Sequence, residues 1–159
     1  MTIVVLAVGG YLFVRSGKLS LATTAPPLPL EKTIARLALR ASIGNAAGQK
    51  DPLPVDDTDM LAGVKTYRER CAVCHGAPGR APTAIANGMF PPPPQLFEKK
   101  DMVTDDPEGV TYWKVTHGIR LSVMPGFGPA LSDTERWQVT MLLAHAGNLS
   151  GSVAAALDR

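Results

Sequence analysis

The chain has few cysteines, few aromatic residues and little excess charge. Of its 159 residues, two are cysteine, 6% are aromatic and 19% are charged, and the formal net charge is +2. The mild charge, with no basic run interleaved with aromatics, excludes a nucleic-acid-binding protein. The absence of cysteine outside positions 71 and 74 excludes a lipid anchor on cysteine. Hydrophobic residues make up 45% of the chain, which is enough for one packed domain with extensions.

The first segment, MTIVVLAVGGYLFV, is apolar and lacks the charged start and small-residue cleavage site of a secretory signal. As a helix, residues 2–14 would be about 20 Å long, so a bilayer crossing needs continuation to Ala22, with Arg15 and Lys18 reaching the headgroups. We expect a single transmembrane anchor over residues 1–22. The alternatives are an anchor whose front is missing and an apolar core helix.

Residues 23–57 combine two linkers with a short helix. LATTAPPLPLEK is proline-rich and predicts a stiff spacer, and GQKDPLPVDD predicts a second linker. Between them, residues 31–43 place apolar and basic side chains on different helical faces. This helix could lie on anionic headgroups or pack on a protein surface. We expect a folded domain over residues 58–148 and a tail over residues 149–159.

Residues 71–75 read CAVCH, a pattern shared by four kinds of site. A disulfide between residues three apart would be strained and would close a tiny loop. Zinc would need further ligands, and the other histidines, His117 and His145, are single and lack metal-ligand spacing. A thiol redox pair would be expected beside a strand, whereas GVKTYRERCAVCH has helical character.

Covalent haem fits this spacing. Two thiols on one helical turn can each add to a vinyl group of one porphyrin, and the next residue then brings an imidazole to the iron. The motif predicts one haem c (heme c) attached through Cys71 and Cys74, with His75 as the proximal iron ligand.

Six-coordinate iron needs a second axial ligand. Met124 stands in SVMPGFG, where proline and two glycines force an irregular loop that can turn a thioether inward. We therefore predict Met124 as this ligand. The other candidates, most of them expected to serve the structure, are Met60, Met102, Met141, His117, His145 and a minor rival, Met89, which precedes PPPP.

Together these residues resemble the class I monohaem c-type cytochromes, in particular membrane-anchored bacterial members. The resemblance covers about residues 61–147 and rests on AGVKTYRERCAVCHG, PPPPQLF and THGIRLSVMPGF. It implies an all-α chain with a small cytochrome c fold around covalent haem, preceded here by the N-terminal transmembrane helix and linker. It also implies that the Pro94 carbonyl accepts the N–H of the proximal imidazole, with Leu96 buried against the haem.

Two further helices are expected within this fold. SDTE at residues 132–135 predicts a capping box that opens a helix. We expect this helix to cross the helix of AGVKTYRERCAVCHG near Tyr67. A middle helix is expected at about residues 107–118, ended by a glycine. Tyr112, Trp113 or Arg120 is a candidate hydrogen-bond partner of a haem propionate, with core packing as the alternative for the two aromatics.

With both axial positions filled, the iron has no open site, so we expect one-electron transfer rather than catalysis by this chain itself. The expected partners are the lipid bilayer and redox proteins in the same membrane, with the chain serving as a subunit of, or a donor or acceptor to, a respiratory or photosynthetic complex. The expected location is the bacterial cytoplasmic membrane, single-pass, with the haem domain in the periplasm. The alternatives are a haem-based gas sensor or peroxidase with an open sixth position, and an accessory structural subunit.

Overall fold

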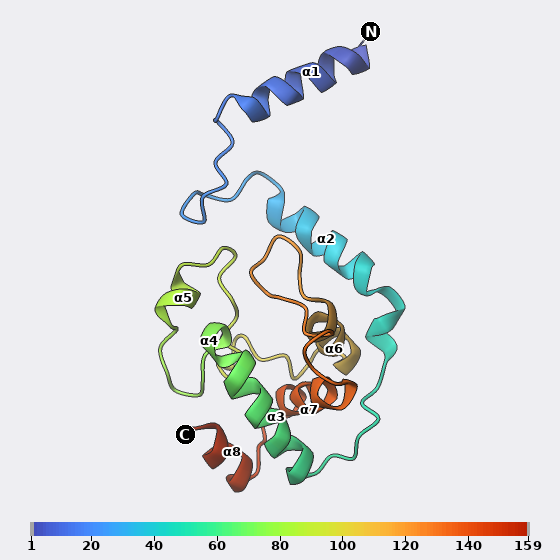
Figure 1. The fold of residues 1–159 in the computed structure, drawn as a ribbon, viewed down its shortest axis with the longest axis vertical. Helices are drawn as coiled ribbons and strands as arrows, with labels where there is room; N and C mark the ends of the chain where they lie inside the picture. The colour runs from blue at the N-terminus through green and yellow to red at the C-terminus, as the bar shows by residue number, and fades with distance from the viewer. Residues whose placement is uncertain (1, 159) are drawn as a thin grey trace.

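The computed structural model describes residues 2–158, and within them all regular structure is helical (Figure 1). Met1 and Arg159, the outer ends of the predicted anchor and tail, lie outside the described residues. The elements are α1 (Thr2–Arg15), α2 (Glu31–Ile43), the 3-10 helix η1 (Gly44–Gly48), α3 (Asp57–Arg70), α4 (Ala72–His75), α5 (Ala84–Asn87), α6 (Glu108–His117), α7 (Asp133–Ala144) and α8 (Gly151–Leu157).

The predicted membrane-spanning helix is wrong. Among residues 2–158, no helix combines the length and the apolar character that a bilayer crossing requires. Helix α1 ends at Arg15 after 14 residues, about 21 Å, against a hydrocarbon core of about 30 Å. Gly17, with φ of 71°, then turns the chain away from the helix direction. This finding corrects the N-terminal part of the predicted fold class and the predicted single-pass location in the bacterial cytoplasmic membrane.

Helices α1 and α2 lie toward one end of the molecule (Figure 1), and their apolar side chains are largely uncovered. No residue of α1 is buried, and in α2 the buried residue is Ile43. On the predicted apolar face of α2, Ile34 and Leu37 are 62% and 61% exposed. Helix α2 has the bounds that the sequence predicts, but the rest of the described chain does not pack over this face.

The segment after α2 is tied to the folded domain. Helix η1 packs against α6, and the backbone N–H of Asp51 donates to Glu108 Oε2 at 3.2 Å. The proline-containing stretch after η1 has no regular structure up to α3, as the sequence predicts.

The core lies where α3 crosses α7. Gly63 of α3 sits against the backbone of Gln138, so the two helices approach more closely than side chains would allow. Trp137, Val139, Met141 and Leu142 of α7 are all buried, as is Tyr67 of α3. The predicted crossing of these two helices near Tyr67 is confirmed.

Helix α6 begins and ends, and helix α7 begins, as the sequence predicts. Pro107 is the N-cap of α6 and Gly118 its C-cap. In α7 the Ser132 hydroxyl accepts from the Glu135 backbone N–H, and the Glu135 side chain accepts from the Ser132 backbone N–H, which is the predicted capping box.

Helix α8 lies within the segment predicted to be a tail. Its buried residues are Val153 and Leu157, and it packs on α3. Arg68 Nη1 donates to Ala156 O at 3.4 Å, and Arg80 Nη2 donates to Asp158 O at 2.9 Å. These two arginines therefore hold the C-terminal helix against the domain.

Candidate functional site

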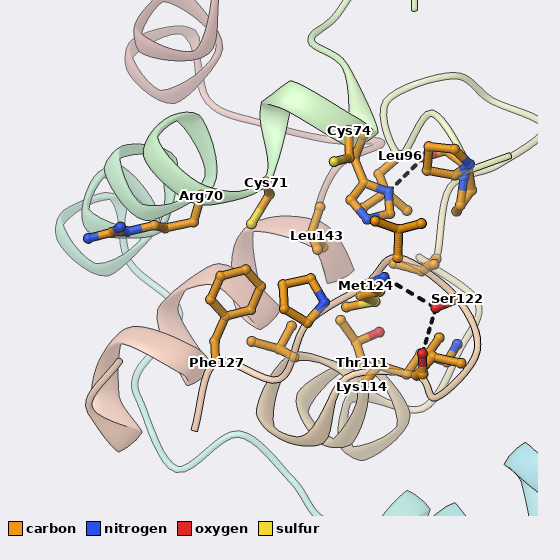
Figure 2. A pocket seen from close by; sticks show the side chains of 18 of the residues that line it. Arg70, Cys71, Cys74, Leu96, Thr111, Lys114, Ser122, Met124, Phe127 and Leu143 are labelled. Carbon is orange, nitrogen blue, oxygen red and sulfur yellow. Dashed lines mark hydrogen bonds between the residues drawn. The ribbon is translucent and has the colours of Figure 1, made fainter. Parts of the chain in front are cut away.

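One apolar cavity lies between α4, α6, α7 and the loops around them (Figure 2). Cys71, Cys74 and His75 contribute to one part of its wall, and Met124 and Phe127 to another. Figure 2 shows the two cysteines reaching the cavity from the α4 side and Met124 and Phe127 from the loop side. The apolar lining includes Leu96, Val103, Val115, Ile119, Val139 and Leu143.

The CAVCH motif forms a single helical turn at the end of α3. Cys71 N donates to Tyr67 O at 2.8 Å, and His75 N donates to Cys71 O at 2.9 Å. The motif therefore continues α3 with a bend. The two cysteines are not bonded to each other, and both line the cavity. Burial, with a smaller effect of Cys74, raises the pKa of the Cys71 thiol to about 12. This thiol is therefore an uncharged group in an apolar wall.

The imidazole of His75 is fixed by a backbone carbonyl. Its Nδ1 lies 2.8 Å from Pro94 O, the contact drawn as a dashed line near Leu96 in Figure 2. Because a carbonyl can only accept, Nδ1 carries the proton, and Nε2 of the neutral ring keeps a free lone pair. Burial lowers the pKa of His75, and the hydrogen bond to Pro94 opposes that effect. The neutral ring can therefore bind a metal through Nε2.

Met124 is held by a closed loop. Ile119 N donates to Met124 O at 3.1 Å, and Met124 N donates to the Ser122 hydroxyl at 3.2 Å. Gly118, with φ of 68°, lies against the backbone of residues 124–126, where a Cβ would come within 2.5 Å of Gly126 N. The loop therefore packs closely on the end of α6 and brings the Met124 side chain to the cavity.

The structure brings six of the eight predicted site residues to the cavity: Cys71, Cys74, His75, Pro94, Leu96 and Met124. Trp113 and Arg120 do not line it. The Trp113 ring lies 4.9 Å from the ring of His117, and Arg120 is exposed. The rival Met89 also contributes to the wall, whereas Met60 and Met141 are buried in the core.

Sequence reasoning missed several wall residues, among them Thr111, Lys114 and Val115 of α6 and Phe127 and Leu143. Positions 111, 114 and 115 share one helical face, so helical spacing within the predicted middle helix could have identified them. Lys114 is 25% exposed at its side chain and pairs with Asp106 at 3.6 Å. It places a positive charge at an otherwise largely apolar wall, as does Arg70.

The donor set and the lining together fit haem c. Two thiols on one turn can make thioether bonds, a neutral imidazole with a free Nε2 can bind iron, and the apolar lining suits a porphyrin. Cations at the wall suit the carboxylates of such a group. When bound, the group supplies a one-electron Fe(III)/Fe(II) couple, and the protein supplies attachment, ligands and the surrounding electrostatics.

Comparison with known proteins agrees with this assignment. Residues 58–141, more than half of the chain, match the family "Cytochrome C oxidase, cbb3-type, subunit III". The chain is 32% identical over 91 residues to a thiosulfate dehydrogenase of Stutzerimonas stutzeri (strain A1501), an alignment that covers 55% of this chain and 27% of that protein. Its fold is similar to a chain of the Kuenenia stuttgartiensis reducing HAO-like protein complex, with a TM-score of 0.51 and 30% identity over 60% of this chain and 46% of that one.

This chain thus spans about a quarter of the curated relative and about half of the solved chain. The family that residues 58–141 match is one of c-type cytochrome domains, and the role of such a domain is electron transfer. From the CAVCH turn, its apolar cavity and the family match, the chain belongs to the family of cbb3-type cytochrome c oxidase subunit III, that is, of c-type cytochrome domains, and carries a covalent haem c on Cys71 and Cys74.

Proposed function

We propose that this chain is a class I monohaem cytochrome that passes single electrons between redox proteins, with His75 and Met124 as the two axial iron ligands. The observation that carries the proposal is the meeting of the His75 imidazole and the Met124 side chain in one apolar cavity beside the attachment cysteines. An iron with both axial positions filled by protein has no position left for a substrate.

The ligand pair also fits the role of an electron carrier. A thioether ligand opposite an imidazole favours the reduced iron and so raises the reduction potential relative to two imidazoles. The hydrogen bond from His75 Nδ1 to Pro94 O acts in the other direction, because it gives the ring more imidazolate character.

For the partners, we propose an assembly in which this chain is one haem-bearing part and another subunit or protein reacts with the substrate. Two likenesses support the proposal: the solved chain belongs to a redox protein complex, and the curated relative is a dehydrogenase almost four times as long as the matched segment. In that arrangement the chain would accept electrons from an oxidising active site, or deliver them to a reducing one.

The ligand assignment is tested by two methionine variants of the holoprotein, Met124→Ala and Met89→Ala, because both residues line the cavity. We expect Met124→Ala to lose the far-red iron–thioether charge-transfer band, to bind CO when reduced and to have a lower reduction potential. Met89→Ala should keep the band and stay closed to CO. The reverse pattern would transfer the ligand role to Met89, and a wild-type protein without the band would contradict the closed-iron function.

A further inference from the structure

The side chain of Gln95 lies between the attachment turn and the proline loop, defined here as residues 91–94. Its Nε2 donates to Cys74 O at 3.2 Å and to Pro93 O at 3.2 Å. One of these carbonyls precedes the His75 residue, and the other precedes Pro94, whose own carbonyl accepts from His75 Nδ1. A single amide group therefore joins the two segments that form the imidazole hydrogen bond.

The backbone on both sides of this amide is fixed as well. Gln95 N donates to Asp101 Oδ2 at 3.1 Å, and Leu96 N donates to His75 O at 3.3 Å. Within residues 2–158, the side-chain bonds of Gln95 add the one hydrogen-bonded connection that reaches back to Pro93. Without them, the Pro93 carbonyl would have no hydrogen-bond partner among the described residues, and the proline loop could move relative to the histidine.

The other end of the amide shows that this arrangement has a cost. Gln95 Oε1 is buried without a hydrogen-bond partner among the described residues, and such a buried unpaired oxygen is destabilising. It rests against Gly76, where a Cβ would lie 2.1 Å from Oε1 and where φ is 72°. The opposite orientation of the amide would point an oxygen at two carbonyl oxygens. An apolar side chain would avoid the buried orphan, so packing alone does not explain a glutamine here.

We propose that Gln95 is a positioning residue that holds the Pro94 carbonyl on the His75 imidazole and thereby sets the donor strength of the iron ligand. This inference rests on the proposed function, since it requires His75 to ligate the iron. A firmly held acceptor increases the imidazolate character of the ring, which stabilises Fe(III). Loss of the Gln95 bonds weakens that hydrogen bond and makes the potential more positive.

The test is Gln95→Leu in the holoprotein, which keeps similar bulk and removes the donor. The matched control is Gln138→Leu, because Gln138 Nε2 also joins two segments, donating to Asp59 Oδ1 at 2.7 Å, but away from the cavity. We expect Gln95→Leu to shift the reduction equilibrium toward Fe(II) by about threefold, which is about 28 mV for one electron. Gln138→Leu should leave the potential unchanged even where it lowers stability.

A second readout follows the hydrogen bond itself. In the reduced, diamagnetic protein, NMR measures solvent exchange of the His75 Nδ1 proton, and we expect it to be about tenfold faster in Gln95→Leu and unchanged in the control. If Gln95→Leu does not assemble with haem, Gln95→Ala provides the same two measurements. An unchanged potential together with an unchanged Nδ1 exchange rate would overturn the proposal.

The wild-type spectrum separates this result from the proposed function. If the iron–thioether band is present in both wild type and Gln95→Leu, the axial ligands are intact and the two readouts test Gln95 alone. If the band is absent from the wild type, the axial ligation proposed above fails first, whatever the Gln95 variants show.

Discussion

Gly63 of α3 and Gln138 of α7 meet at the helix crossing, where a Cβ on residue 63 would stand 2.3 Å from the Gln138 carbonyl oxygen. The obstacle is backbone, which cannot rotate away as a side chain could. We therefore expect Gly63→Ala to lower the free energy of unfolding by about 1–3 kcal/mol, because the helices must separate. Urea unfolding of the holoprotein measures this, with Gly48→Ala as the control, since a Cβ there meets nothing within 4 Å. Equal stability of Gly63→Ala and wild type would show that the helices are not in close contact.

Tyr67 supports the attachment turn from the core side. Its hydroxyl oxygen lies 2.8 Å from Gly76 O and 3.1 Å from His75 O, so its one proton is shared between the two carbonyls, and its side chain is fully buried. We expect Tyr67→Phe to lower stability by about 1–3 kcal/mol, because a buried carbonyl loses its donor. Thermal or urea unfolding checks this against Tyr11→Phe on exposed α1, which should have no measurable effect. A stable Tyr67→Phe protein would mean that the Gly76 carbonyl finds another donor, as the His75 carbonyl already has in Leu96 N.

Asp57 links α8 to the start of α3. Its Oδ2 accepts from Ser152 Oγ at 2.5 Å and from Ser150 Oγ at 2.8 Å, and these bonds lower the pKa of Asp57 below its ordinary value. A lowered pKa in the folded state means that the carboxylate stabilises the fold above the unfolded value and loses this effect as the pH falls through the folded value.

The stability of wild type should therefore fall more steeply than that of Asp57→Asn below about pH 4. Urea unfolding at a series of pH values gives the two curves, and amide exchange at Val153 follows α8 itself. Parallel curves for the two proteins would show that Asp57 contributes nothing that depends on its charge.

Lys114 places a cation at the cavity wall, paired with Asp106 at 3.6 Å. A nearby positive charge favours the reduced iron, which carries one positive charge less. We expect Lys114→Met to shift the reduction equilibrium toward Fe(III) by about threefold, a modest effect because Asp106 already offsets part of the charge. Spectroelectrochemistry checks this against Lys99→Met on the exposed surface. An equal shift in both variants would show a general effect of net charge rather than of the cavity wall.

Local sequence signals predicted several elements closely. The capping box at Ser132 and Glu135 sets the start of α7, and the glycine at position 118 sets the end of α6. Both signals act through bonds and backbone angles within a few residues. The CAVCH turn is equally local. These features need no knowledge of what packs against them.

Features that depend on distant packing were harder to predict. Trp113 is a predicted partner of a haem propionate, but the packing of α6 on α7 and η1 turns Lys114 to the cavity, and neighbouring positions on a helix point about 100° apart. The apolar run at the N-terminus suggested a span that the helix, ending at Arg15, does not provide. Helix α8 was missed because its anchors, Val153 and Leu157, are buried by α3, about 90 residues earlier in the chain.

The most direct test of the account is the absorption spectrum of the purified holoprotein, oxidised and then reduced, with and without CO. Iron closed by His75 and Met124 predicts a far-red iron–thioether band in the oxidised protein and a reduced spectrum that CO leaves unchanged. A missing band together with ready CO binding would mean an open sixth position, and the chain would then be a ligand-binding haem protein rather than an electron carrier.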